Sequence, residues 1–243
     1  MLGLGNSLMK SGAVEGAFSI DSLPSAIHWY KFDEGIHLNS GDPTRVERWD
    51  DQIGSKHLEQ GSSARQPLYN NGELSFDSSL AKLVQSAEVN LRGFTICLVV
   101  EFTAAPNNET IVGHSTQSLQ LIRLAAGATT KVRLQIDDGG AIAATITAGT
   151  AYPAAGTKFL FTITRDITAA SNNIKTYVDD AFKSEGTHSA NLKVFDIDEI
   201  GCHAGSSNPF QGNISEYVIF SDVLSDSDRA LVQADIMTRN SIS

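Results

Sequence analysis

Basic residues, cysteines and long apolar runs are all scarce in this chain of 243 residues. Eighteen lysines and arginines stand against 28 acidic residues, which gives a formal net charge of -10. So acidic a chain lacks the basic face that binds nucleic acid or anionic lipid, and we expect neither as a partner. No apolar stretch reaches the length of a membrane-spanning helix.

Only two cysteines are present, Cys97 and Cys202, and each lies in an apolar run. Two buried free thiols are the preferred interpretation, and a disulfide is the alternative. Near the start, Lys10 follows a short stretch interrupted by glycine, which is unlike a secretory signal. We therefore expect no signal peptide and synthesis in a cytoplasm.

Residues 94–102 carry the clearest strand pattern in the chain. Alternate positions place five apolar side chains on one face, and we expect all of them to be buried: Phe94, Ile96, Leu98, Val100 and Phe102. The other face is mixed. This pattern predicts a sheet that is packed firmly on one side and lightly on the other.

Short strand-like runs separated by turns fill most of the remaining chain. They cover residues 26–32, 46–49, 74–76, 119–124, 132–136, 141–146, 159–163, 174–178, 197–202 and 214–220. In the last run, Ile214, Val218 and Phe220 should be buried under the same alternation. Residues 137–140, Asp-Asp-Gly-Gly, are typical of a hairpin turn. Many strands and almost no helix predict one all-β, two-sheet antiparallel sandwich spanning residues 26–243.

The only strong helix signal lies at the C-terminal end. Ser225 is a typical N-cap residue, and Asp226 and Asp228 would place acids in the first turn. Apolar residues then follow at helical spacing. We expect a helix over residues 226–238 that packs Leu231 and Ala234 on the sandwich.

Several segments, taken in order, resemble the laminin-G-like, concanavalin-A-like jelly-roll superfamily. They are Trp29-Tyr-Lys-Phe-Asp-Glu-Gly35, Trp49-Asp-Asp51 with Gly54, Gly72-Glu-Leu-Ser-Phe-Asp77, Phe94-Thr-Ile96, and Phe210-Gln-Gly212 through Phe220 to Asp228-Arg229. The resemblance covers about residues 26–240 and implies a jelly roll. Because that fold hosts lectins, adhesive modules and virion proteins, it does not by itself decide the function.

Residues 1–25 form a Gly/Ser-rich arm whose first eight residues resemble the start of small structural proteins of tailed bacteriophages. We expect this arm to anchor the chain in a larger assembly. Its contacts would be other virion proteins or further copies of the chain. The apolar anchors would be Leu2, Leu4, Leu8, Val14 and Phe18.

Laminarinase-type glycoside hydrolases share this fold and act through a pair of catalytic carboxylates. The nearest pattern is Asp196-Ile-Asp198-Glu199, which lacks the flanking glutamates of those enzymes. Asp196 and Asp198 can share a strand face, whereas Glu199 points the other way. We interpret them as solvated carboxylates at a sheet edge, and we expect no catalytic residue.

Acidic pairs at turns and a few aromatic residues are the remaining candidates for ligand contact. Asp50-Asp51, Asp137-Asp138 and Asp179-Asp180 are acidic pairs, but calcium needs six to eight oxygens. We expect no cofactor, and calcium at a sandwich rim is the alternative left open. Trp29, Tyr30, Trp49 and Tyr69 fit a core better than a sugar-stacking surface. Trp49, with Asp50 and Asp51, is the best candidate for a ligand-facing group.

The sequence thus favours a non-enzymatic structural and binding protein located in a bacteriophage virion. Such a protein would be a decoration, fibre or tail-associated subunit. Its lectin-like domain would face outward and bind a host-surface glycan. A bacterial lectin-like carbohydrate-binding module is the first alternative, and a degenerate glycoside hydrolase is the second.

Overall fold

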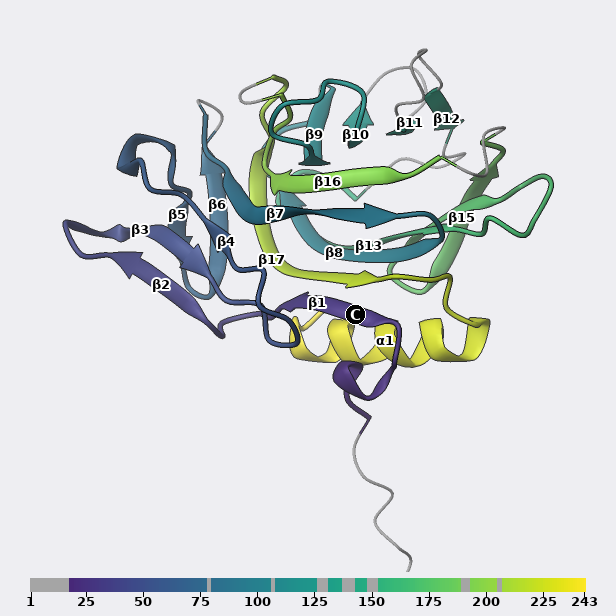
Figure 1. Cartoon of the computed structure of the whole chain (residues 1–243). Coiled ribbons are helices and arrows are strands. Elements are labelled where there is room, and N and C mark those ends of the chain that lie inside the picture. The colour runs from purple at the N-terminus through teal and green to yellow at the C-terminus, as the bar shows by residue number, and fades with distance from the viewer. Residues whose placement is uncertain are drawn as a thin grey trace, which may run out of the picture.

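The computed structural model describes residues 18–77, 80–105, 108–125, 131–136, 143–147, 153–188, 193–204 and 207–243. In these segments antiparallel strands form two stacked sheets, and one α-helix lies against the outside of the sandwich (Figure 1). The prediction of an all-β sandwich that ends in a helix is confirmed. The two sheets are named below after a central strand of each.

The β8 sheet carries the longest strand pairings of the molecule. From one edge its order is β15 (Ala181–Gly186), β14 (Ile174–Val178), β13 (Lys158–Arg165), β8 (Phe94–Phe102) and β17 (Gln211–Phe220). Beyond β17, the sheet divides into β1 (Ala26–Tyr30) on one half and β6 (Glu73–Asp77) with β5 (Leu68–Asn70) on the other.

The β16 sheet stacks on the β8 sheet. Its order is β12 (Ala143–Thr147), β11 (Lys131–Gln135), β10 (Leu121–Ala125), β9 (Glu109–Gly113), β16 (Phe195–Ile200), β7 (Leu83–Leu91), β4 (Leu58–Glu59), β3 (Asp42–Trp49) and β2 (Ile36–Asn39). β3 also pairs with β5, so it joins the two sheets at one end. Two short 3-10 turns, Ile20–Ser22 and Ser63–Arg65, complete the described elements.

The inner core between the sheets is built by the alternation that the sequence displays. Phe94, Ile96, Leu98, Val100 and Phe102 of β8 are all buried in it, as predicted. The opposite face of β8 is also buried, because Cys97 and Val99 lie beneath the C-terminal helix in a second apolar group. The expectation of a lightly packed face is therefore wrong.

This second group, here called the outer cluster, lies between the β8 sheet and helix α1 (Asp226–Arg239). Its buried members are Ile20, Ala26, Trp29, Cys97, Val99, Leu160, Val218, Phe220, Leu224, Val232 and Ile236. Both thiols are free and buried, which confirms the prediction for Cys97 and Cys202.

A β-bulge in β17 changes which side chains reach each face. Ile214 pairs with Val100 and Glu216 with Val99, so one extra residue lies between the two pairs. Ile214 therefore lies in the inner core, whereas Val218 and Phe220 lie in the outer cluster. All three are buried as predicted, but the single uninterrupted alternation is wrong.

Helix α1 begins where the sequence indicates, with a different face against the sheet. The Ser225 hydroxyl accepts a hydrogen bond from the Asp228 amide at 3.1 Å and so caps the helix. Val232 and Ile236, four residues apart, are buried, whereas Leu231 is 50% exposed and Ala234 is also exposed. The expected contact of Leu231 and Ala234 with the sandwich is wrong. The helix is rotated so that Val232 and Ile236 face the sheet, and residue type alone does not determine this rotation.

A buried carboxylate on β17 fixes the end of the helix to the sheet. Glu216 accepts hydrogen bonds from Trp29 Nε1 at 2.8 Å, from Arg239 Nη2 at 2.8 Å and from Asn240 Nδ2 at 2.6 Å. These donors come from β1 and from the last turn of α1 and its cap. The pairing thus joins three segments that are distant in sequence.

Residues 18–25 pack on their own domain. Ile20 is fully buried in the outer cluster, and Phe18 packs against its margin. Phe18 thus contacts its own domain, and its role as an intermolecular anchor stays a prediction. Leu2, Leu4, Leu8 and Val14 lie outside the described residues, as do Asp137 and Asp138, so the assembly role of the arm stays a prediction.

Candidate functional site

Trp49 and Asp51 are structural residues rather than ligand contacts. Trp49 is fully buried, and its Nε1 donates to the carbonyls of Lys31 and Glu34 at 3.1 and 3.2 Å. Asp51 accepts from His28 Nδ1 at 2.6 Å and from the Trp29 amide at 3.0 Å. The expectation that Trp49 and Asp51 face a ligand is wrong, since both side chains hold the end of β3 to β1.

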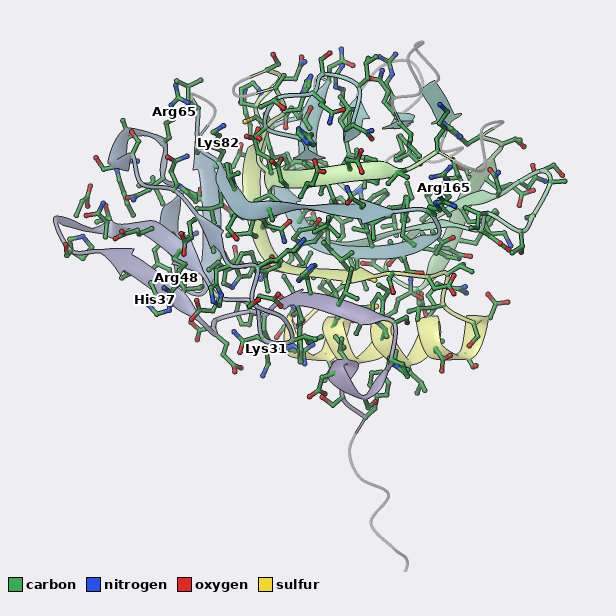
Figure 2. The ribbon with its side chains drawn as sticks, viewed as in Figure 1. Lys31, His37, Arg48, Arg65, Lys82 and Arg165 are labelled. Carbon is green, nitrogen blue, oxygen red and sulfur yellow. The ribbon has the colours of Figure 1, made fainter. Side chains whose placement is uncertain are left out.

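Asp50 is half-buried, and basic side chains surround its carboxylate. His37 Nε2 and Arg48 Nε each lie 2.7 Å from it, and Figure 2 shows these two side chains together on β2 and β3. Burial acts to raise the pKa of Asp50, but these two hydrogen bonds lower it below its usual range. The same strands border a pocket of about 350 Å³. Asp50 does not line this pocket, and because its carboxylate is already paired with His37 and Arg48 it offers no free group to a ligand.

The carboxylates of β16 are also occupied. Asp198 accepts from the amide and the hydroxyl of Ser115, both at 2.6 Å. Asp196 accepts from Asn90 at 2.6 Å, and buried Glu199 pairs with Lys82 at 2.6 Å. The interpretation as solvated edge groups is therefore wrong for Glu199. These acids stabilise the β16 sheet instead of forming a free pair.

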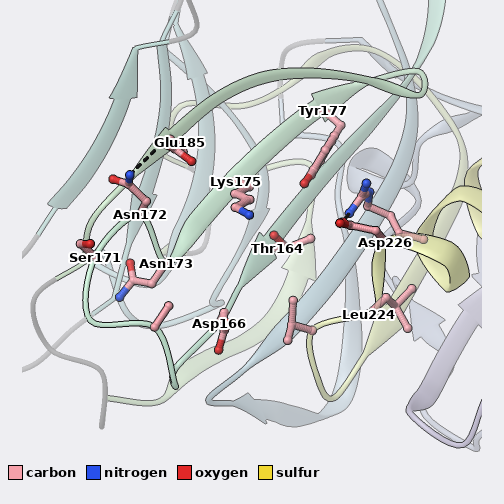
Figure 3. A pocket seen from close by; sticks show the side chains of 13 residues that line it. Thr164, Asp166, Ser171, Asn172, Asn173, Lys175, Tyr177, Glu185, Leu224 and Asp226 are labelled. Atoms are coloured by element: carbon pink, nitrogen blue, oxygen red, sulfur yellow. Dashed lines mark hydrogen bonds and ion pairs between the residues drawn. The ribbon is translucent and has the colours of Figure 1, made fainter.

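A larger groove of about 380 Å³ opens on the outer face of the β8 sheet, beside the start of α1 (Figure 3). The outward residues of β14, the loop after β13, β15 and the segment leading into α1 surround it. Its lining residues are Thr164, Asp166, Ala169, Ser171, Asn172, Asn173, Lys175, Tyr177, Glu185, Val223, Leu224, Asp226 and Arg229.

The loop from 166 to 173 is held firmly along one side of this groove. Asp166 accepts from the amide and hydroxyl of Thr168, at 2.8 and 2.6 Å, and these bonds lower its pKa. Asn172 adopts a left-handed backbone with φ of 51° and donates to Glu185 at 2.7 Å. Asn173 is bonded to the backbone of His188 in both directions. The polar wall of the groove is therefore preorganised.

The groove offers two groups that the fold does not use. The Tyr177 hydroxyl and the Lys175 ammonium have no hydrogen-bond partner among the described residues, and Figure 3 shows both within the groove. Arg229 stacks on the Tyr177 ring, with Cζ 4.1 Å from the ring centroid, and fixes the orientation of the ring. Burial raises the pKa of Tyr177, so the hydroxyl stays protonated at neutral pH.

Sequence reasoning missed Lys175 and Tyr177, although the signal was present. Ile174 and Val178 alternate with them and are buried in the inner core. The residues between must therefore point to the outer face of the sheet. The sequence did not show that helix α1 leaves Lys175 and Tyr177 uncovered in a groove.

The groove combines an aromatic ring with fixed amide, carboxylate, hydroxyl and ammonium groups. Such a set can hydrogen-bond a polyhydroxylated ligand and orient it. Among the described residues, no group of three or more His, Cys, Asp and Glu side chains is placed to hold a metal ion. Nor does any helix in the described segments have the length and apolarity to cross a membrane.

The profile of the concanavalin A-like lectin/glucanases superfamily matches residues 77–228. The chain belongs to this superfamily. The resemblance noted from the sequence is thus confirmed for the family and for its jelly-roll fold. No curated protein matches the chain.

Solved structures of the same fold share little sequence with this superfamily member. The binding domain of botulinum neurotoxin serotype D has a TM-score of 0.58 at 16% identity, and the receptor-binding domain of botulinum neurotoxin type G has 0.55 at 14%. In both comparisons 87% of this chain and 51% of the toxin domain are covered, so the chain spans about half their length. A heptameric pentraxin from Limulus polyphemus has a TM-score of 0.52 at 10% identity, with 66% and 81% covered.

Proposed function

We propose that this chain is a non-enzymatic binding module that takes a saccharide in the β14 groove, the groove lined by Lys175 and Tyr177. The observation that carries the proposal is the chemistry of that groove. An unused phenol and an unused ammonium stand beside amide and carboxylate groups already fixed by the loop. A preorganised polar wall binds without a large ordering cost.

The comparisons support a binding role at the level of the fold. A module named for receptor binding, from botulinum neurotoxin type G, has the same architecture. Its low identity carries no residue over to this chain. The proposal of binding by this chain therefore depends on its own groove residues.

The acids of the groove support a non-catalytic role. Hydrolysis of a glycosidic bond uses a free acid and a second free carboxylate in one cleft. Here Asp166 is bonded by Thr168, Glu185 by Asn172 and Asp226 by Arg229. Each acid therefore serves to position a neighbour, and we expect no release of reducing sugar from any bound glycan.

The proposed setting is a tailed-bacteriophage virion, with the module used to attach to a host-surface glycan. This part rests on the resemblance of the first eight residues to phage structural proteins. Quantitative mass spectrometry of purified particles tests it, with a fixed copy number per particle as the expected result. Absence from the particles would favour the bacterial lectin-like module.

The groove itself is tested by a glycan array followed by calorimetric titration of the best oligosaccharide. Tyr177→Phe removes only the hydroxyl, and Lys175→Gln replaces the ammonium by a shorter, neutral amide. We expect each to weaken binding about 5- to 50-fold, because a hydrogen bond to the ligand is lost. Tyr69→Phe is the matched control, since its hydroxyl bonds Asp33 at 3.2 Å outside the groove. Equal affinity of all variants would refute the groove as the binding site.

A further inference from the structure

Two arginines lie side by side on the outer face of the β16 sheet. Arg123 of β10 and Arg133 of β11 are direct partners in the antiparallel register. Their strand neighbours Ile122, Leu124 and Val132 are buried in the inner core, so both arginines point outward. This face lies on the side of the sandwich away from α1 (Figure 1).

Neither guanidinium has an acidic partner among the described residues. Arg123 Nη2 lies 3.3 Å from Nε2 of His203, whose Nδ1 lies 2.9 Å from the Thr110 hydroxyl. The Nε of Arg123 is buried without a hydrogen-bond partner in the described structure. Glu109, the acid on neighbouring β9, accepts from the Gln211 amide.

His203 supplies no compensating negative charge. Burial and the positive charge of Arg123 lower its pKa to about 4, so the ring is neutral at pH 7. A neutral ring with its proton on Nδ1 donates to Thr110 and accepts from Arg123. Gly113 of β9 lets the Cys202–His203 segment lie close to the strand. A Cβ at Gly113 would lie 2.5 Å from the Cys202 carbonyl oxygen and 2.6 Å from the Cβ of His203. The loop of His203 is thus seated on β9 and holds Arg123 in place.

Like charges directly opposite on two strands repel each other. The chain carries 28 acidic residues, so acids are abundant as partners for arginines elsewhere on its surface. The inner face of these strands packs in the inner core through Ile122, Leu124 and Val132, without either arginine. The pair therefore fits a ligand that brings the missing negative charge.

We propose that Arg123 and Arg133 form a site for an oxyanion, a carboxylate or sulfate group, carried by an acidic saccharide. Guanidinium forks bind such groups through two parallel hydrogen bonds, which a lysine cannot match. That the carrier is a saccharide rests on the proposed function, whereas the oxyanion site stands on the arginine geometry. The site lies on the sheet opposite to the one that bears the β14 groove.

The test uses the full chain and three probes at constant ionic strength. They are hexagalacturonate, its fully methyl-esterified form, and sodium sulfate. Calorimetric titration should show binding of the acid form at least tenfold tighter than that of the ester. Arg133→Gln should remove this preference, and Arg133→Lys should restore only part of it. Arg92→Gln, which removes an exposed arginine at the β7–β8 turn, should leave it unchanged.

A second readout guards against misfolding. Because Arg133→Gln removes a like-charge contact, its melting temperature without ligand should equal or exceed that of the wild type. Tyr177→Phe should leave the acid preference intact, so failure of the groove and failure of this site are distinguishable. Binding of sulfate but not hexagalacturonate would overturn the saccharide carrier. Equal binding of acid and ester, or an unchanged preference in Arg133→Gln, would overturn the site.

Discussion

The two outer faces of the sandwich differ in how their charges are compensated. On the β8 sheet, helix α1 covers an apolar cluster, and buried Glu216 is bonded by Trp29, Arg239 and Asn240. On the β16 sheet, Arg123 and Arg133 face outward without an acid among the described residues. The part of the β8 sheet under α1 compensates its charge within the chain, whereas the Arg123–Arg133 pair on the β16 sheet leaves its positive charge available.

This difference separates structural polar groups from binding groups better than residue type does. Arg239 and Arg123 are both partly buried arginines, but only Arg239 has carboxylate partners, Glu216 and Asp235. A paired buried charge stabilises a particular arrangement of segments. An unpaired one leaves hydrogen-bonding capacity for a ligand.

The largest expected effect tests whether the outer cluster is a second core. Ile236→Ala in the outer cluster should lower the free energy of unfolding by about 2–5 kcal/mol, as should Leu98→Ala in the inner core. Leu231→Ala, on the exposed face of the same helix, should change it by less than about 0.5 kcal/mol. Urea unfolding measures all three. A small loss for Ile236→Ala would mean that α1 is only loosely attached.

A smaller effect on the free energy of unfolding concerns Glu216, the buried carboxylate between the β8 sheet and the end of α1. Glu216→Gln should cost about 2 kcal/mol, because the new amide cannot accept from all three donors and leaves the Arg239 charge less compensated. Asp235→Asn is the matched control. It removes the more exposed partner of Arg239 and should cost about 0.5 kcal/mol. Similar losses in the two variants would remove the contrast between the faces.

The sequence predicted most strands, because period-two alternation reports directly on a buried face. It also located the cap of α1 at Ser225. It missed the face of the helix and the bulge before Glu216, since both depend on register between distant segments. A single extra residue moves Val218 from one face to the other.

The sites were harder to predict than the fold. Trp49 and Asp51 looked ligand-facing because aromatic and acidic residues often are, but contacts with segments about 20 residues away bury them. The sequence predicts the strand that carries Tyr177 but gives no sign of a binding role for its side chain. The Arg123–Arg133 pair depends on a cross-strand register that no local pattern encodes.

The smallest expected effect is a pH dependence of stability that comes from His203, beside Arg123 on the outer face of the β16 sheet. The pKa of His203 is about 4 in the folded chain, below the ordinary 6.5, so protonation favours the unfolded chain. The stability that neutral His203 contributes is complete above about pH 6.5 and is lost as the pH falls toward 4. We expect a loss of about 1 kcal/mol at pH 5 relative to pH 7.5, and a smaller loss at any pH between them.

His203→Gln should remove this part of the pH dependence, as measured by urea unfolding at pH 7.5 and pH 5. Arg123→Gln should raise the pKa of His203, because one of the two causes of its depression is removed. Titration of the imidazole signals by NMR measures that shift directly. A His203 midpoint near 6.5 in the wild type would show that Arg123 and the ring are not held together. The outer face of the β16 sheet would then lack a fixed Arg123, the feature that distinguishes it from the helix-covered face of the β8 sheet.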